Sequence, residues 1–217
     1  MSAAYGKQAW WPGDSAFEIS LGAILVQNTS WTNAARAIAQ LRRRDLLHAE
    51  SLAALDRPRL EALLRPAGCY RQKARRVNVF SHWWLAEIPQ SRQPAQDTRT
   101  LRDMLLSLHG IGRETADCIL LYAFGRPVFV VDAYTRRLLF RLGLAEVPPG
   151  ARAYESLRAQ VEQLTGPKPD VLGELHALIV EHGKQVCRAR PLCGDCVLRA
   201  RCSYQPPADP LAGQLRP

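Results

Sequence analysis

The sequence has no hydrophobic run that approaches the ~18 residues of a membrane-spanning helix, and its first residues, MSAAYGKQAW, lack the long apolar core of a signal peptide. These absences argue against a membrane or exported protein, so we expect a cytoplasmic one. Lysine is also scarce, since only four of the 29 basic residues are lysines and the others are arginines. A mechanism that needs a lysine amine therefore has few candidate residues in this chain.

Patterns typical of β-strands are equally sparse. Apolar residues recur at spacings of three and four along nearly the whole chain, as they do on the buried face of a helix. The best strand candidate, VFVV at 128–131, is too short to outweigh this pattern. We therefore predict an all-α fold, with a capping box at Ser15 and Glu18. Helices are expected near residues 15–28, 31–41, 51–55, 58–64, 72–84 and 101–108, loops at 89–98 and 148–150, and a poorly ordered tail after Cys202.

The composition is that of a folded protein with a polyanionic partner. A chain of 217 residues with 47% hydrophobic content can bury one good core or two small domains. Its formal charge of +9 and its isoelectric point near 9.6 favour a partner such as nucleic acid.

Residues 108–113, LHGIGR, place two glycines two positions apart between two amphipathic helical stretches. Glycine permits a positive φ and leaves backbone N–H groups unshielded, and the next helix begins there with its positive dipole end exposed. Such a turn suits a phosphate oxygen, which makes Gly110, Gly112 and Arg113 candidate DNA-binding residues. A plain helix-to-helix turn is the alternative.

The chain continues as ETADCILLYAFGRPVFVVDAYTRRL. The ordered set of the glycine hairpin, the segment Gly-Arg-Pro at 125–127 and Asp132 resembles the signature of the endonuclease III superfamily of DNA glycosylases, also called helix-hairpin-helix-GPD. The resemblance implies a two-domain helix-hairpin-helix fold, with a central domain at 22–134 and a second domain formed by 1–21 and 135–217. It also implies a monomeric base excision repair enzyme that binds double-stranded DNA containing a damaged base, and that associates with the nucleoid when bound.

Asp132 is the predicted catalytic carboxylate. Hydrolysis of an N-glycosidic bond builds positive charge on the sugar, so it needs a carboxylate near the anomeric carbon and a water positioned to attack. Asp132 follows the apolar segment 128–131 and precedes the next helix, whose dipole helps a desolvated carboxylate to keep its charge. A helix N-cap is the alternative role, and the two roles can coexist.

Family members that also cut the DNA strand place a lysine just after the hairpin, where its amine forms a Schiff base with the sugar. This chain has Glu114 there, and none of its four lysines lies in or next to the motif. Because a carboxylate cannot form that adduct, we predict a monofunctional glycosylase whose AP lyase activity is doubtful. Glu114 is either a second polar group of the catalytic site or an acid favoured by the helix dipole.

Near the N-terminus, Trp10-Trp11-Pro12 and the later segment QNTSW, which ends at Trp31, resemble the 3-methyladenine DNA glycosylase III branch of the superfamily. In that branch these aromatics wall the pocket for the flipped base, and Glu after the hairpin is tolerated. Tryptophan faces attract a cationic alkylated purine by about 0.5–2 kcal/mol. The resemblance therefore favours alkylated purines as substrates, whereas ordinary core aromatics are the alternative interpretation.

Other positions match the family's contacts with the duplex. Gln27 matches the glutamine that fills the hole left by the flipped base. The segment 68–70, with Cys69 at its centre, matches the loop that wedges into the base stack, although Cys69 is smaller than the side chains usual there. The helical pattern also predicts that Lys73 is exposed. Candidate phosphate contacts are Arg71, Lys73, Arg75 and Arg113, unless these are only solvated surface charges.

Four of the six cysteines form the pattern C-x5-C-x2-C-x5-C, one residue shorter in its first gap than the endonuclease III pattern. These are Cys187, Cys193, Cys196 and Cys202. Four thiolates this close together can hold a 4Fe-4S cluster, as the resemblance implies, and we expect the cluster to serve DNA binding rather than base removal. A structural zinc site is the alternative, although two C-x2-C pairs would be more usual for it.

Three other functions stay open at this point. The first is an endonuclease III proper, a glycosylase and AP lyase on oxidised pyrimidines, against whose lyase step Glu114 argues. The second is a non-catalytic iron-sulfur DNA-binding protein, against which Asp132 argues. The third is an RNA-binding module, which would require that the cysteines hold zinc.

Overall fold

The structure is a computed structural model that describes residues 1–88, 94–145 and 151–205. Its regular elements are all helices. Within these ranges the chain forms no strand and no helix long and apolar enough to span a bilayer, and the prediction of an all-α fold is confirmed. The predicted loop at 148–150, residues 89–93 of the predicted loop at 89–98 and most of the predicted tail lie outside the described residues. In chain order the elements are α1 (Ser2–Tyr5), α2 (Ala16–Leu25), α3 (Trp31–Arg42), α4 (Ala49–Ala54), α5 (Arg57–Leu64), η1 (Arg65–Ala67), α6 (Tyr70–Glu87), α7 (Thr98–Ser107), α8 (Arg113–Cys118), η2 (Ile119–Ala123), α9 (Ala133–Arg141), α10 (Ala151–Thr165), α11 (Pro169–Gln185), η3 (Cys193–Asp195) and η4 (Arg199–Arg201).

The start of α2 shows how local chemistry sets a helix boundary. Ser15 Oγ accepts a hydrogen bond from the Glu18 N–H at 3.2 Å, which satisfies one of the backbone donors left over at the helix start. Leu21, Ile24 and Leu25 follow at helical spacing and are completely buried. The predicted helix start is therefore confirmed, and α2 forms the centre of the core.

Lys73 in α6 has an environment that differs from the prediction. The expectation that it is exposed, and so able to reach a phosphate, is wrong. Lys73 is buried, with only 1% of its surface exposed to solvent. Its ammonium group donates hydrogen bonds to the carbonyl oxygens of Leu25, at 2.9 Å, and Ala67, at 2.6 Å. Burial lowers the pKa of Lys73. The side chain therefore ties the C-terminal end of α2 to the turn before α6.

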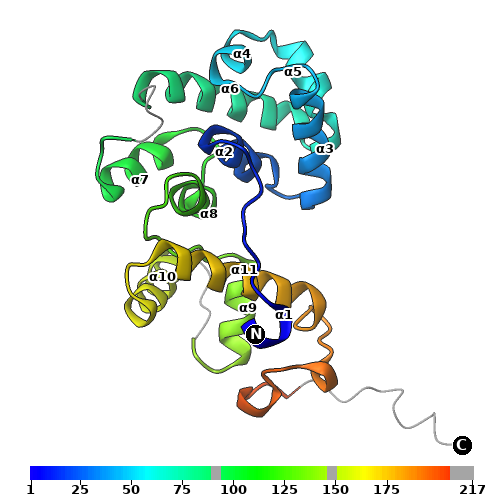
Figure 1. The fold of residues 1–217 in the computed structure, drawn as a ribbon, viewed down its shortest axis with the longest axis vertical. Coiled ribbons are helices and arrows are strands. Elements are labelled where there is room, and N and C mark those ends of the chain that lie inside the picture. Colours follow the sequence, from blue (N-terminus) through cyan, green and yellow to red (C-terminus); the bar gives the residue numbers. More distant parts are fainter. Residues whose placement is uncertain (89–93, 146–150, 206–217) are drawn as a thin grey trace, which may run out of the picture.

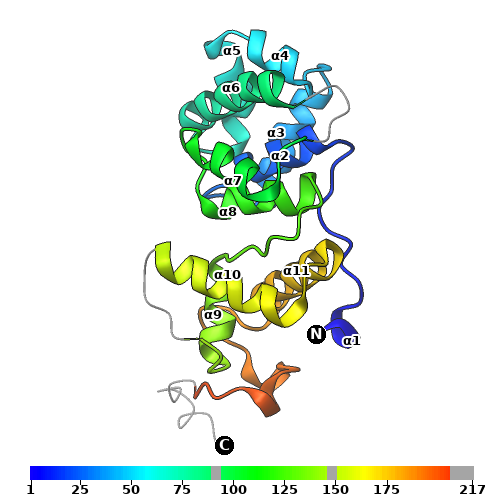
Figure 2. The ribbon, with the colours of Figure 1, turned by 90° about the vertical axis from the view of Figure 1, so that its left-hand side faces the viewer.

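The helices gather in two groups. Figures 1 and 2 show α2 to α8 in the upper half of the molecule, here called the upper group, and α1, α9, α10 and α11 in the lower half, here called the lower group. Two connections cross between the groups, one from α1 to α2 and the other from η2 to α9. The predicted domain boundary at residue 22 falls within α2, and the division at 22–134 stays a prediction.

A cluster of charged side chains joins α7 and α8 of the upper group to α10 of the lower group. Arg102 of α7 makes two hydrogen bonds, of 2.6 and 3.1 Å, to the buried carboxylate of Asp117 on α8. The same guanidinium reaches Glu155 of α10 at 2.9 Å. Tyr154 of α10 donates a further hydrogen bond to Asp117 at 2.8 Å. Each charge thus has a partner, which is the condition for burying charge in a protein interior.

Candidate active site

Asp132 caps the N-terminus of α9, and each of its carboxylate oxygens faces a different group. Oδ1 accepts a hydrogen bond of 2.7 Å from the Thr135 N–H. Oδ2 lies 3.7 Å from Nε2 of His176 on α11. Asp132 is only 8% exposed. The capping role and a catalytic role are therefore compatible, because they use different oxygens.

His176 is buried, and Tyr122 of η2 contacts it from the other side. The Tyr122 hydroxyl is 2.6 Å from His176 Nδ1 and 3.1 Å from the carbonyl oxygen of Gly173. Within the described part of the chain, His176 Nε2 has no hydrogen-bond partner, since its 3.7 Å distance from Asp132 exceeds a hydrogen-bond length. Tyr122, His176 and Asp132 form a continuous line of polar groups inside the protein, here called the Asp132 row.

The two carboxylates of this region have pKa values displaced in opposite directions. Burial alone would raise the pKa of Asp132, but His176 and the hydrogen bond from the Thr135 N–H outweigh burial and hold that pKa below its usual value. Glu114, in the first turn of α8, is exposed, yet partial loss of hydration and the charge of Asp132 raise its pKa. Asp132 is therefore the carboxylate that stays charged, and Glu114 is the one that takes up a proton more readily.

Glu114 stands at the position after the hairpin, and two of the four lysines have contacts elsewhere. Lys73 is buried and already bonded to two carbonyl oxygens. Lys184 of α11 approaches the site from the side of the N-terminal segment, with its Nζ 5.3 Å from the centre of the Trp10 ring. Lys184 is therefore a candidate amine for a Schiff-base mechanism that uses no residue of the motif.

Aromatic rings lie against the Asp132 row. Trp11 has its ring centre 5.4 Å from that of Trp31 and 5.3 Å from that of Tyr122. Trp10 lies 5.8 Å from the imidazole of His176, and 5.6 Å from Trp11. The structure thus brings the three predicted pocket tryptophans together, beside two members of the row.

Gly22 of α2 provides the space for two of these rings. A Cβ at this position would lie 3.0 Å from Nε1 of Trp11 and 3.4 Å from the ring of Trp31. The Trp11 N–H is buried and lacks a hydrogen-bond partner among the described residues. Pro12, the fourth predicted pocket residue, is exposed.

The predicted hairpin is a tight turn between α7 and α8. Gly110 has a φ of +83°, which favours glycine, and the Ile111 N–H donates to the carbonyl oxygen of Leu108 at 3.1 Å. A Cβ at Gly110 would lie 2.7 Å from Cδ of Arg76, whereas one at Gly112 would have nothing within 4 Å among the described residues. Gly110 is thus required by the turn, and Gly112 leaves its backbone open to an approaching phosphate.

Gln27 is bonded to this hairpin. Its Nε2 donates to the Gly110 carbonyl oxygen at 3.2 Å and to Thr115 Oγ1 at 2.7 Å, and its Oε1 accepts from the Arg76 guanidinium. These contacts link α2, α6 and the hairpin. To fill a hole in the duplex, Gln27 would have to exchange these bonds for bonds with DNA, and that role stays a prediction.

Arg113 and Cys69 lie at the surface. Arg113 pairs with Glu155 of α10 at 3.1 Å, while 44% of its side chain remains exposed. Cys69 is exposed and has a φ of +44°, directly after Gly68 with a φ of +68°. This sharp turn leaves the small thiol at the surface before α6. The predicted contacts of both residues with DNA stay predictions.

The four predicted cluster cysteines lie around one small hollow after the end of α11. They are Cys187, Cys193, Cys196 and Cys202. Hydrogen-bonding nitrogens reach two of the sulfurs: Arg141 Nη1 lies 3.3 Å from Cys187, and His182 Nε2 lies 3.6 Å from Cys196. Hydrogen bonds to the sulfurs are one way in which proteins tune iron-sulfur clusters.

The described residues contain no group of three or more His, Cys, Asp or Glu side chains that could hold a single metal ion. A 4Fe-4S cluster makes a different demand, because each of its four cysteines binds a different iron, so the sulfurs need not converge on one point. Four thiols around one hollow, with nitrogen donors beside them, are a donor set that fits such a cluster.

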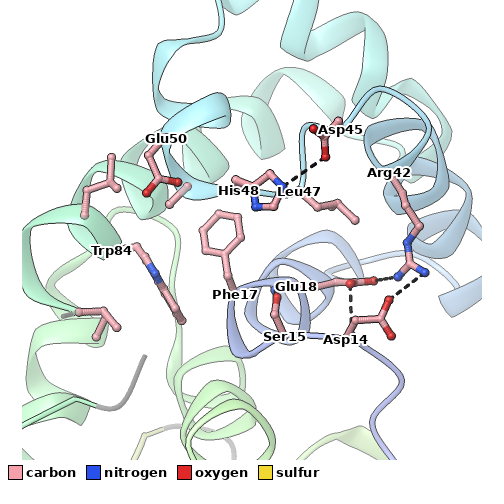
Figure 3. A pocket seen from close by; sticks show the side chains of 13 residues that line it. Asp14, Ser15, Phe17, Glu18, Arg42, Asp45, Leu47, His48, Glu50 and Trp84 are labelled. Atoms are coloured by element: carbon pink, nitrogen blue, oxygen red, sulfur yellow. Dashed lines mark hydrogen bonds and ion pairs between the residues drawn. The ribbon is translucent and has the colours of Figure 1, made fainter. Parts of the chain in front are cut away.

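A separate, larger hollow of about 730 Å³ lies at the N-terminal end of α2. Figure 3 shows Phe17 and Trp84 facing into it, and the carboxylates of Asp14 and Glu18 directed toward Arg42. Among the described residues, its lining includes none of the predicted site residues. The base pocket predicted at the tryptophans therefore does not coincide with this hollow, and its place beside Asp132 stays a prediction.

Sequence reasoning missed His176 and Tyr122. His176 comes from α11, which lies outside the motif, whereas Tyr122 lies within the motif but has no role that local chemistry indicates. Tertiary packing brings the two side chains together beside Asp132. The available signal was a histidine within the apolar helical segment HALIV at 176–180, which indicates a buried polar group that needs a partner. The sequence alone did not identify that partner.

Comparison with known sequences gives three findings. Residues 21–165 match the HhH-GPD superfamily of base excision DNA repair proteins. A Methanocaldococcus jannaschii protein named as a candidate DNA repair glycosylase is 41% identical over 201 residues, which are 91% of this chain and 90% of that protein. Endonuclease III of Thermotoga maritima is 28% identical over 190 residues, which are 87% of this chain and 83% of that protein.

Solved structures are similar along most of the chain. The H. pylori 3-methyladenine DNA glycosylase bound to 1,N6-ethenoadenine has a TM-score of 0.69 and 28% identity, and the match covers 83% of this chain and 90% of that one. A non-covalent complex of endonuclease III with DNA has a TM-score of 0.78 and 21% identity, over 93% of this chain and 90% of that one. The second likeness shows the fold alone.

Proposed function

Because this chain belongs to the HhH-GPD superfamily of base excision DNA repair proteins, we propose that it removes alkylated purines from double-stranded DNA by hydrolysing their N-glycosidic bond. Its general class, a base excision repair DNA glycosylase with DNA as partner, follows from the family. The alkylated base, the hydrolytic outcome and the action as a monomer in the cytoplasm, associated with the nucleoid when bound, are parts of the proposal.

The contact between the tryptophans and the Asp132 row carries the proposal. Trp10 lies against His176, and Trp11 lies against Tyr122, so a base held by the rings would have its sugar close to Asp132. An alkylated purine carries positive charge, and aromatic faces favour such a base over a neutral one by about 0.5–2 kcal/mol. This preference supports a cationic substrate over an oxidised pyrimidine.

Asp132 would stabilise the positive charge that develops on the sugar as the base leaves. Its low pKa keeps it ionised over the physiological range, and its buried position strengthens the electrostatic attraction. A cationic base is already a good leaving group and requires no proton. Glu114, with its raised pKa, is therefore expected to contribute less than Asp132 to the removal of such a base.

The position of Glu114 supports the monofunctional part of the proposal, because a carboxylate cannot form a Schiff base. The second candidate is a glycosylase and AP lyase of the endonuclease III type. One observation favours it, since the Lys184 amine lies 5.3 Å from the Trp10 ring, at the edge of the proposed pocket. A Lys184→Gln variant separates the two candidates.

We also propose that the four C-terminal cysteines hold a 4Fe-4S cluster. Cys187, Cys193, Cys196 and Cys202 would each bind one iron, and Arg141 would donate a hydrogen bond toward Cys187. When bound, the cluster would hold the loop at 187–202 in a fixed shape. The exposed arginines of this loop would then face the DNA backbone, and the base-removing chemistry would not involve the cluster.

The proposed function is tested by incubating the protein with four duplexes, which contain a methylated purine, an oxidised pyrimidine, 8-oxoguanine opposite adenine, or an abasic site. Each reaction is analysed with and without hot alkali. We expect breaks only after alkali, and strongest with the methylated purine. Asp132→Asn should lower the single-turnover rate by about 100-fold or more, whereas Glu114→Gln should lower it much less.

Breaks without alkali, together with covalent trapping of the protein on DNA by borohydride, would contradict the monofunctional proposal. Loss of trapping in Lys184→Gln would then identify the amine. Glu114→Lys is the positive control, because it restores an amine directly after the hairpin and should create a trapped complex. Equal affinity for damaged and intact duplex with no base release would instead indicate a non-catalytic DNA-binding protein.

A further inference from the structure

His176 lies between two groups that both constrain where its protons sit. The Tyr122 hydroxyl has one proton, and the Gly173 carbonyl oxygen can only accept it, at 3.1 Å. If Tyr122 donates to Gly173, then His176 Nδ1 must donate to Tyr122 at 2.6 Å. On the opposite side, Nε2 faces the ionised carboxylate of Asp132, which also only accepts.

Two proton arrangements fit these contacts, and both place a proton on Nε2. A doubly protonated imidazole satisfies Tyr122, Gly173 and Asp132 together. A neutral imidazole satisfies Asp132 only when Tyr122 turns its proton toward Nδ1 and leaves Gly173 without that donor. A neutral ring with its proton on Nδ1 would point a lone pair at the carboxylate, which is unfavourable.

We propose that His176 is a positioning residue, whose Nε2–H holds the Asp132 carboxylate in the orientation and charge state needed for base removal. The inference rests on the proposed function, since it takes Asp132 as the reacting carboxylate. Thr135 fixes Oδ1 and His176 fixes Oδ2, so the plane of the carboxylate is set by two contacts on opposite sides. The proposal requires this 3.7 Å contact to shorten to a hydrogen bond when DNA binds, as catalytic contacts that are long in free enzymes often do.

The groups around this pair come from each of the packed elements. Glu114 and Cys118 belong to α8, Tyr122 to η2, Arg136 to α9 and Glu174 to α11. Of these five neighbours, Arg136 alone carries a positive charge. Removal of His176 therefore leaves Asp132 in a buried environment with less compensating positive charge, and the pKa of Asp132 should rise.

The test uses His176→Leu, which removes the donor, and His176→Gln, which keeps an N–H donor on a shorter side chain. His82→Leu on the exposed face of α6 is the matched control. Single-turnover base release from the methylated-purine duplex is measured across pH. In parallel, the carboxyl carbon of Asp132 is titrated by 13C NMR, with its signal identified by its absence in Asp132→Asn.

We expect His176→Leu to move two midpoints to higher pH by about one pH unit or more: the midpoint of the pH profile of base release and the midpoint of the Asp132 NMR titration. The reason is that a buried carboxylate without its partner binds a proton more readily. His176→Gln should stay close to the unmodified protein, and His82→Leu should match it. Tyr122→Phe, which keeps the ring but frees Nδ1, should give a smaller change in the same direction.

Unchanged midpoints in His176→Leu would overturn the proposal, even if base release became slower, because they would leave His176 only a packing role. The NMR titration does not depend on base release. If the unmodified protein released no base from any duplex but the titration midpoint still moved, the proposed function would fail while the contact between His176 and Asp132 would stand.

Discussion

Replacement of Arg102 by methionine tests how much the buried charge cluster between the two helix groups contributes to stability. Methionine keeps an unbranched apolar stem but removes the guanidinium that makes two hydrogen bonds to Asp117 and one to Glu155. The Asp117 side chain is 0% exposed, so among the residues that the structure describes it would keep only the hydroxyl of Tyr154 as a hydrogen-bond partner. Breaking a buried pair by removing one member costs about 3–5 kcal/mol.

The measurement is urea unfolding followed by the helical circular dichroism signal. With a slope of about 2 kcal/mol per molar urea, the midpoint should fall by about 1.5–2.5 M. Arg158→Met is the matched control, because Arg158 and its partners Glu155 and Glu162 are all partly exposed. The control should lose no more than about 1 kcal/mol.

The pH dependence of the Arg102→Met variant gives an independent check. Burial already raises the pKa of Asp117 above its usual value with Arg102 in place, and loss of Arg102 should raise it further. The folded state then binds more protons than the unfolded state, so the stability of the variant should fall as pH rises from 5 to 8. A loss equal to that of Arg158→Met, with no extra dependence on pH, would refute the reasoning.

Three further predictions concern the hairpin, the pocket and the cysteines. Gly110→Ala should lower the free energy of unfolding by about 1–2 kcal/mol, because Gly110 has a positive φ and the new Cβ would collide with Arg76. Gly112→Ala should change the free energy of unfolding by less than about 0.5 kcal/mol in the same urea assay. Trp11→Leu should weaken binding of a duplex with a cationic base analogue by roughly 2- to 30-fold, whereas Trp11→Phe should lose less, as a fluorescence titration against an intact duplex would show. Cys196→Ser should lower the iron content of the purified protein and its absorbance at about 400 nm, while most of the helical circular dichroism signal remains. Zinc in place of iron in the unmodified protein would contradict the proposed cluster.

Local patterns predicted the parts of the site that lie within one stretch of chain. The two glycines at 110 and 112 indicated the hairpin because a sharp turn between helices needs a positive φ, and Gly110 has one. Asp132 was predicted at a helix start, and it caps α9 through Thr135. Such features depend on neighbours within a few residues, and those neighbours can be seen in the sequence.

The environment of Lys73 could not be predicted in the same way. Its position in α6 follows helical spacing, but whether that face meets solvent or another helix depends on where α2 and η1 pack. Two carbonyl oxygens at the ends of those elements receive its ammonium. An amphipathic pattern separates apolar from polar faces, and it does not distinguish a solvated cation from one that bonds to buried backbone.

The Asp132 row also depends on tertiary packing, and this explains why sequence reasoning identified only one of its three residues. The motif contains Asp132 and, ten residues earlier, Tyr122, but only the aspartate has a role that local chemistry indicates. His176 comes from α11, 44 positions later in the chain, and reaches Asp132 because α9 and α11 pack together. A carboxylate that stays charged inside a protein is stabilised by hydrogen bonds or by nearby positive charge. Thr135 donates to one oxygen of Asp132, and the fold places His176 Nε2 3.7 Å from the other, which is the contact that the proposal for His176 is built on.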